Sequence, residues 1–316
     1  MRYDPLDYLY TSARIRAMES RLVGREKINQ LLAAPTVGDV EKLLEEWGAT
    51  KEQEYGLKGA FASVAESLPD KALLHFLQYP YDCHNLKTVE KCRIKGVAPD
   101  ALLIDLGSVS TKSLITVSEK ELFSLLPAHM AKGVEEAREA FAKTGNPQEI
   151  DFVLDRAAYA DMAEAAAPYP FAAELVRVQA ELLNLSMCLR LLRMRNGELG
   201  RSILMRAALP VGSFDEPFLL SCYDGGEEAF CKQVLHTPYE GVFEKEQSLA
   251  DTERRIDDHL MGLIRRARYV TFGAEVPIAY LFAAERQGKN LRILLAGKEA
   301  GLDAQTIQTR MRESYV

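Results

Sequence analysis

Residues 277–301 read PIAYLFAAERQGKNLRILLAGKEAG, and this stretch decides the fold class that the sequence predicts. Its apolar residues recur at steps of three and four, as one face of an α-helix requires: Leu281, Ala284, Gly288, Leu291 and Leu295. Charged residues fall on the opposite face: Glu285, Arg286, Lys289 and Arg292. Pro277 suits a first helical turn, and Gly301 suits the left-handed residue that closes a helix. The stretch therefore predicts an amphipathic helix.

The landmarks of this helix occur three times along the chain. An Asn-Leu pair stands at Asn85-Leu86, Asn184-Leu185 and Asn290-Leu291, with spacings of 99 and 106 residues. The first and third asparagines each lie 11 residues before a closing glycine, Gly96 and Gly301, whereas Gly197 follows the middle asparagine slightly later. A period near 100 residues is too long for a solenoid repeat. It predicts three homologous helical domains, at residues 1–111, 112–215 and 216–316.

Copies two and three share further residues. Residues 150–189 and 256–295 align without a gap and contain eight identities, which is weak support in helices rich in Ala and Leu. Helical periodicity alone is the alternative explanation. A proline 13 or 14 residues before the asparagine and the similar loops LGSV (106–109) and VGSF (211–214) favour a true repeat. On that basis we expect Leu86, Leu185 and Leu291 each to lie in the core of its own domain.

Helix signals also dominate elsewhere in the chain. A Ser, Thr, Asn or Asp cap followed by proline or an acidic residue marks helix starts, and glycine marks helix ends. Residues 101–118 have some strand character but contain a glycine and several hydroxyl residues, so we expect a loop there. The predicted helices include Thr36 or Asp39 to Trp47, Tyr81–Lys95 opened by Pro80, Asn146–Ala166, Phe171–Arg195 and Gln247–Phe272, with a further cap-like signal at Thr237-Pro238. The sequence thus predicts an all-α protein.

Composition restricts the class of protein. The chain has 316 residues, 47% hydrophobic and 27% charged, which is typical of a globular protein with two or three domains. Its longest stretch without Asp, Glu, Lys or Arg is Ile28–Gly38, far shorter than the roughly 20 apolar residues of a membrane-spanning helix. The N-terminal residues carry charges and lack the apolar segment of a secretory signal. We therefore expect no transmembrane span and a cytoplasmic location.

Cysteine usage and net charge limit the chemistry further. The five cysteines are scattered and form no CxxC pair, which favours reduced thiols over a disulfide framework. The net charge of −7 argues against nucleic acid as the main partner, because phosphate binding needs a basic surface.

Motifs for catalysis, cofactors and metals are missing from the sequence. It contains no GxxxxGK[ST], HExxH or GxSxG pattern. The nearest approach to a metal cluster is His75, Cys83, His84 and Cys92, whose spacing does not suit a tetrahedral site. We therefore assign no catalytic, cofactor-binding or metal residue, and no small-molecule substrate.

Two basic clusters stand out in the acidic chain. One contains Arg190 and Arg193 with Arg195, and the other contains Arg265 and Arg268 with Arg266. Cations at the C-terminal end of a helix are stabilised by its dipole, which is the structural interpretation. The functional interpretation is a partner-facing surface that includes Arg190, Arg193, Arg265 and Arg268. The sequence leaves both open.

Several stretches together resemble the C subunit of bacterial and archaeal V-type/A-type ATPases, a relative of the d subunit of the eukaryotic vacuolar proton pump. They are YLYTSARIRAMESRLVGREKINQLLAAPTVGDVEKLL (8–44), HTPYE (236–240), NLRILLAGKEAGL (290–302) and RMRESYV (310–316). The resemblance covers essentially the whole chain. The middle copy departs, because Ser186 stands where Lys87 and Arg292 stand in the others.

The resemblance implies a non-catalytic subunit of the central rotor, made of three pseudo-repeated helical domains that form a funnel around a pseudo-threefold axis. It implies a socket between the central-stalk shaft and the proteolipid rotor ring, on the cytoplasmic face of the membrane, in ATP-coupled proton or sodium transport. Two alternatives are a helical adaptor or scaffold of an unrelated complex and a soluble helical enzyme. Co-purification with a membrane ATPase would exclude the first, and a convergent polar cluster would favour the second.

Overall fold

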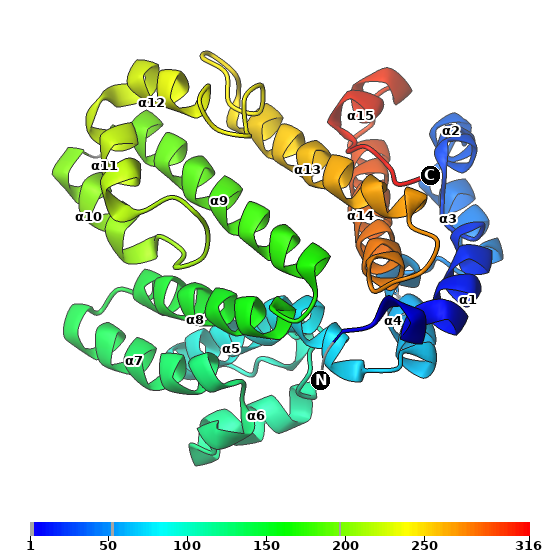
Figure 1. The fold of residues 1–316 in the computed structure, drawn as a ribbon. Coiled ribbons are helices and arrows are strands. Elements are labelled where there is room, and N and C mark those ends of the chain that lie inside the picture. The colour runs from blue at the N-terminus through cyan, green and yellow to red at the C-terminus, as the bar shows by residue number, and fades with distance from the viewer. Residues whose placement is uncertain (1–2, 52–53, 196) are drawn as a thin grey trace. The chain divides into compact units, whose positions relative to one another are not determined.

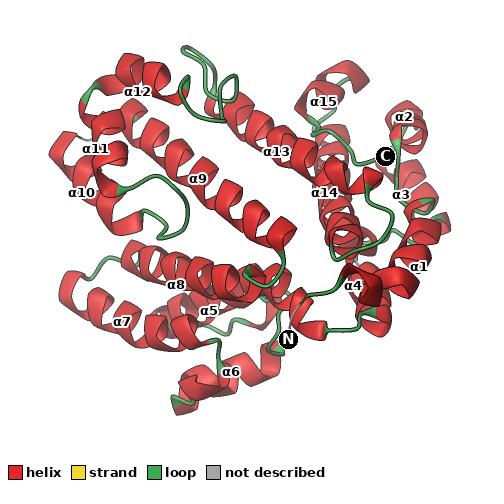
Figure 2. Cartoon of the chain, in the orientation of Figure 1, coloured by secondary structure: helices red, strands yellow, loops and turns green. Residues whose placement is uncertain are grey.

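The structure is a computed structural model that describes residues 3–51, 54–195 and 197–316. Within those residues the chain forms helices and no strand (Figure 1, Figure 2), which confirms the predicted all-α class. The chain divides into two compact units. Unit 1 contains residues 1–71 and 250–316, and unit 2 contains residues 72–249. No helix in the described part of the chain has both the length and the apolar character needed to cross a bilayer.

Unit 1 combines the two ends of the chain, and its elements pack around the long helix α14. Its elements are η1 (Pro5–Tyr8), α1 (Leu9–Glu19), α2 (Arg25–Ala33), α3 (Val37–Glu46), η2 (Glu54–Gly56), α4 (Leu57–Ser67), α13 (Leu249–Arg265), η6 (Arg266–Tyr269), α14 (Glu275–Glu299) and α15 (Ala304–Arg310). The predicted cap of α3 is present, because Thr36 Oγ1 accepts a hydrogen bond from Asp39 N at 3.1 Å.

Unit 2 is continuous in sequence, and α8 packs against α5, α7 and α9. Its elements are η3 (Lys71–Leu74), α5 (His75–Lys95), η4 (Asp100–Leu102), α6 (Thr111–Lys120), η5 (Phe123–Leu125), α7 (Ala128–Thr144), α8 (Gln148–Ala166), α9 (Pro170–Arg193), α10 (Gly197–Ala207), α11 (Glu216–Asp224) and α12 (Gly226–Val234). Helices α8 and α9 match the predicted helices to within two residues at each end.

Helix α14 is more deeply buried than an amphipathic helix should be. Every residue from Val276 to Ala284 is buried, and α1, α4 and η6 are among the elements that pack against α14. Arg286 was expected on the polar face, but it is buried and pairs with Asp257 Oδ1 of α13 at 2.7 Å. The amphipathic prediction is therefore wrong for the first half of α14. Gly301 does follow the helix with a positive φ of 68°, as predicted.

Three local predictions were also wrong. Pro80 lies inside α5 instead of opening it, because the helix begins five residues earlier at His75. Residues 111–118 were expected to lie in a loop, but they belong to α6. Ser110 caps this helix by accepting a hydrogen bond from Ser113 N. Thr237-Pro238 opens only a series of turns, and Thr237 Oγ1 bonds the carbonyl of Val234 behind it.

Each of the three landmark asparagines makes the same contact. Asn85 in α5 donates to Ile104 O at 2.8 Å and accepts from Ile104 N at 2.9 Å. Asn184 in α9 pairs in the same way with Leu209, and Asn290 in α14 pairs in the same way with Arg312. All three asparagines are buried. A primary amide matches the donor and acceptor of one backbone residue, so each asparagine attaches the returning chain to its long helix.

The acid three residues before the asparagine explains the Gly-Ser loops after copies one and two. Asp82 accepts hydrogen bonds from both N and Oγ of Ser108, at 2.9 and 2.5 Å. Glu181 accepts from N and Oγ of Ser213 at 2.7 and 2.8 Å. A Cβ on the preceding glycine would lie 2.1 Å from the Asp82 carboxylate in one loop and 2.7 Å from Glu181 Cγ in the other. Each loop therefore needs glycine beside the acid and serine after it.

The leucines beside the asparagines are all fully buried. Leu86 lies in a core with residues of α6, α7 and α8, including Leu114, Met130 and Leu154. Leu291 lies in a second core with residues of α2 and α3. Leu185 has no exposed surface either. The division into three domains stays a prediction.

Candidate functional site

Arg193 lies in the last turn of α9 and is bound within unit 2. Its Nη2 lies 2.7 Å from Glu227 Oε1 of α12, and its Nη1 donates to the carbonyl of Gln247. Three elements that are distant in sequence are thereby held together at the end of α9. These contacts favour the structural interpretation for Arg193.

Arg265 and Arg268 hold the C-terminal residues of unit 1. Arg265 Nε donates to Ser314 O at 3.1 Å, and its Nη1 pairs with Glu313. Arg268 Nη1 lies 3.4 Å from Tyr315 O, and its guanidinium lies over the Tyr315 ring. These two arginines therefore bind residues 313–315, and the side chain of Tyr315 is buried.

Arg190 is exposed, unlike its neighbour Arg193 one turn further along α9. It lines a groove in unit 2 between α8, α9 and α10, with a volume of about 750 Å³. Apolar side chains dominate the lining, among them Phe152, Leu183, Met187, Met194 and Ile203. The sequence analysis did not predict this groove. The sequence does contain a pattern that could have indicated the groove. Its residues Leu183, Met187, Arg190 and Met194 follow helical spacing on the face of α9 opposite its core residues.

These contacts predict different results for the two arginines of α9. Arg193→Glu removes a charge-assisted hydrogen bond and places a carboxylate beside Glu227, so the free energy of unfolding should fall by about 1.5–3 kcal/mol. The melting temperature should then fall by several degrees. Arg190→Glu should lower the melting temperature less than Arg193→Glu does, because Arg190 is the more exposed of the two side chains. Calorimetry of both variants checks this, and equal losses would contradict it.

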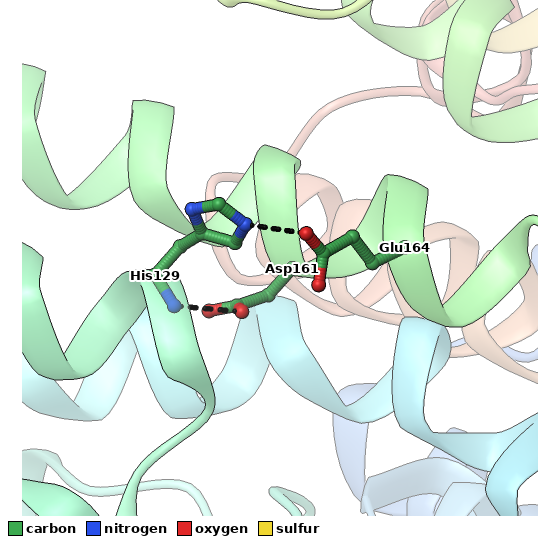
Figure 3. Close-up of side chains that lie close together, drawn as sticks. All are labelled: His129, Asp161 and Glu164. Atoms are coloured by element: carbon green, nitrogen blue, oxygen red, sulfur yellow. Dashed lines mark hydrogen bonds and ion pairs between the residues drawn. The ribbon is translucent and has the colours of Figure 1, made fainter.

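One group of side chains has the spacing of a possible cation site. Figure 3 shows His129 of α7 with Asp161 and Glu164 of α8, whose ligand atoms lie within 4.8 Å of one another. Asp161 already accepts hydrogen bonds from the backbone N–H groups of His129 and Met130, at 2.9 and 2.8 Å. His129 Nε2 lies 2.8 Å from Glu164 Oε1. Because both Asp161 oxygens are used to cap α7, the arrangement fits a helix cap better than a metal centre.

Of the histidines and cysteines considered in the sequence, Cys92 is a buried thiol and the other three make separate contacts. Cys83 is buried and lies 3.5 Å from Leu154 O, and burial strongly raises the pKa of its thiol. His84 lies against Leu102 O, and His75 stacks on Tyr79. A thiol with a raised pKa is a poor nucleophile and a poor metal ligand.

Comparison with known proteins gives matches over nearly the full chain. The family model described as ATP synthase (C/AC39) subunit matches residues 11–310. The chain is 24% identical to the C subunit of the V-type sodium ATPase of Enterococcus hirae, and the alignment covers 98% of this chain and 99% of the relative. It is 23% identical to the C subunit of the A-type ATP synthase of Thermococcus kodakarensis, over 97% of this chain and 90% of the relative. The corresponding protein of Methanosarcina mazei is 24% identical, over 96% and 92%.

Proposed function

Because the chain belongs to the C/AC39 subunit family of V/A-type ATPases, we propose that it is a non-catalytic subunit of the central rotor, which links the central-stalk shaft to the proteolipid ring of the membrane. The observation that carries the proposal is the family match over residues 11–310. Membership in the family confirms the resemblance found in the sequence.

The proposed socket lies on the cytoplasmic face of the membrane as a peripheral subunit and couples ATP turnover to proton or sodium transport. Its three repeats, at residues 1–111, 112–215 and 216–316, form a funnel around a pseudo-threefold axis. The repetition of the asparagine contact at Asn85, Asn184 and Asn290 supports the three repeats. These buried asparagine side chains fix other segments of the chain to the long helices. Such attachments suit a socket, because a socket must transmit torque.

The proposal predicts no nucleotide chemistry in the isolated chain. Phosphate recognition by a P-loop needs glycines and a lysine in a fixed pattern, and the sequence lacks it. Titration with ATP and Mg²⁺ in a calorimeter should therefore give no binding heat, and the isolated chain should not release phosphate. Micromolar affinity for ATP would contradict this.

Co-purification tests the function itself. The tagged chain is expressed in its own cells, the membranes are extracted with a mild detergent, and the bound proteins are identified by mass spectrometry. We expect the shaft and ring subunits of one ATPase to elute together with the tagged chain. Elution alone would overturn the proposal, and elution with an unrelated set of proteins would instead support the adaptor interpretation.

A further inference from the structure

The core of each long helix is completed by the helices that follow the returning chain. Residues of α6 and α7 share a core with Leu86 of α5, and α11 and α12 pack against α9. The third core is different, because its helices come from the other end of the chain. Leu291 of α14 shares its core with residues of α2 and α3, namely Leu31, Leu32, Val40 and Leu44. Helices α2 and α3 therefore take the place in unit 1 that α6 and α7 have in unit 2.

The side chain three residues before each landmark asparagine holds the start of these helices. In copies one and two, Asp82 and Glu181 each accept hydrogen bonds from the N and Oγ of a serine. Helices α6 and α11 begin three residues after that serine. In the third copy, Gln287 accepts a hydrogen bond from Val23 N at 2.7 Å, and α2 begins two residues after Val23. Gln287 thus stands in the place of the acid, and Val23 in the place of the serine.

Two side chains of α14 hold α2 and α3 in place. Gln287 Nε2 donates to Tyr55 O at 2.8 Å, and Tyr55 follows α3 in the chain. The Gln287 amide therefore binds backbone groups on both sides of the two helices. Between these points, Lys298 Nζ donates to Leu32 O and Ala34 O, at the C-terminal end of α2. Helices α2 and α3 have 9 and 10 residues, and helices this short depend on packing for their stability.

The third core is held less firmly than the first two. The bond from Val23 to Gln287 spans 264 residues of sequence, whereas the corresponding bonds to Asp82 and Glu181 span 26 and 32. Bringing more distant residues together costs more chain entropy. Gln287 is also neutral, and hydrogen bonds to a charged acceptor are stronger than those between neutral groups. Tyr55 has a positive φ of 56°, which is unfavourable for a residue other than glycine.

We propose that unit 1 contains a conformational device at this point, in which α2 and α3 detach together from α14 while the other helices stay folded. Gln287 and Lys298 keep the closed state in place. Detachment uncovers the apolar side chains of Leu291 and Leu294 on α14, which the closed state buries. The inference depends on contacts within unit 1 alone, so it stands or fails independently of the proposed function.

The single tryptophan of the chain reports on this detachment. Trp47 follows α3, packs against the core of Leu291, and lies beside Lys27 of α2, whose Nζ is 5.4 Å from the ring centroid. In urea unfolding of the full chain, we expect Trp47 fluorescence to change at a lower urea concentration than the circular dichroism of all helices. Gln287→Met should lower the fluorescence midpoint further, with a smaller effect on the circular dichroism. Coincident midpoints in the unmodified chain would overturn the proposal.

Amide hydrogen exchange followed by mass spectrometry locates the opening in the full chain. After correction for intrinsic rates, α2 and α3 should exchange about tenfold faster than α14 or more. Gln287→Met should raise the rates of α2 and α3 about tenfold, because it removes two hydrogen bonds. The matched control is Asp82→Asn in copy one, which should raise the rates of α6 and α7 and leave α2 and α3 unchanged. Equal protection of α2, α3 and α14, faster exchange in α3 alone, or unchanged rates in Gln287→Met would overturn the proposal.

Discussion

Replacement of Leu86, Leu185 or Leu291 with alanine is expected to lower the free energy of unfolding by about 2–5 kcal/mol at each position. Each leucine is fully buried, so the change removes apolar contacts and leaves a cavity that the packed helices fill only in part. The loss should be of similar size at all three positions, because the three leucines have equivalent places beside the hydrogen-bonded asparagines.

Urea unfolding followed by circular dichroism measures these losses. Leu183→Ala is the matched control, because Leu183 lies on the same helix as Leu185 but is 44% exposed, and it should cost clearly less. A large loss at Leu86 and Leu185 with a tolerated change at Leu291 would show that the repeated Asn-Leu pattern reflects helical periodicity alone. It would leave the helical fold intact but remove the support for three equivalent repeats.

The second large effect is expected at the buried ion pair of Glu90 and Arg138. Glu90 of α5 is fully buried, and Arg138 of α7 contacts both of its oxygens at 2.8 and 2.9 Å. Ser118 Oγ also donates to Glu90 at 2.7 Å. Arg138→Met should cost about 3–5 kcal/mol, because the buried Glu90 carboxylate keeps only the more exposed Arg93 as an ion-pair partner. Glu90→Gln should cost less, about 1.5–3 kcal/mol, because Arg138 is partly exposed and keeps its pair with Glu121. The double replacement should cost less than the sum of the single ones.

The same pair predicts a dependence of stability on pH. Burial alone would raise the pKa of Glu90, but the hydrogen bonds from Arg138 and Ser118 and the charge of Arg138 hold it below its usual value. The contribution of the pair is therefore complete above the unfolded-state pKa of about 4.3 and is lost as the pH falls through the folded-state pKa. The control is Glu139→Gln: Glu139 follows Arg138 in the sequence and forms an exposed pair with Lys143. Its replacement should cost less than about 1 kcal/mol. Equal costs at Glu90 and Glu139 would contradict the burial argument.

The sequence predicted those features of the fold that depend on nearby residues. The cap at Thr36, the limits of α8 and α9 and the closing glycines Gly96 and Gly301 follow from contacts within one or two turns. Local signals failed where packing overrode them. Buried neighbours cover the first half of α14 on all sides, and α5 continues through Pro80.

The site residues were harder to predict because their partners are distant in the chain. Arg193 reaches Glu227, which lies 34 residues away, and Arg265 reaches Ser314, 49 residues away. Helical spacing reveals which face a residue occupies but not which other segment covers that face. The apolar spacing from Leu183 to Met194 is visible in the sequence, but only the folded unit shows that this face of the helix is exposed.

The link between shaft and ring is tested most directly by ATP-driven ion transport in membrane vesicles that lack this chain. Dyes sensitive to protons and to sodium report transport, and phosphate release reports ATP hydrolysis. The account predicts that hydrolysis continues without ion transport, and that adding the purified chain restores transport. Transport at the normal rate in vesicles without the chain would contradict the proposed role.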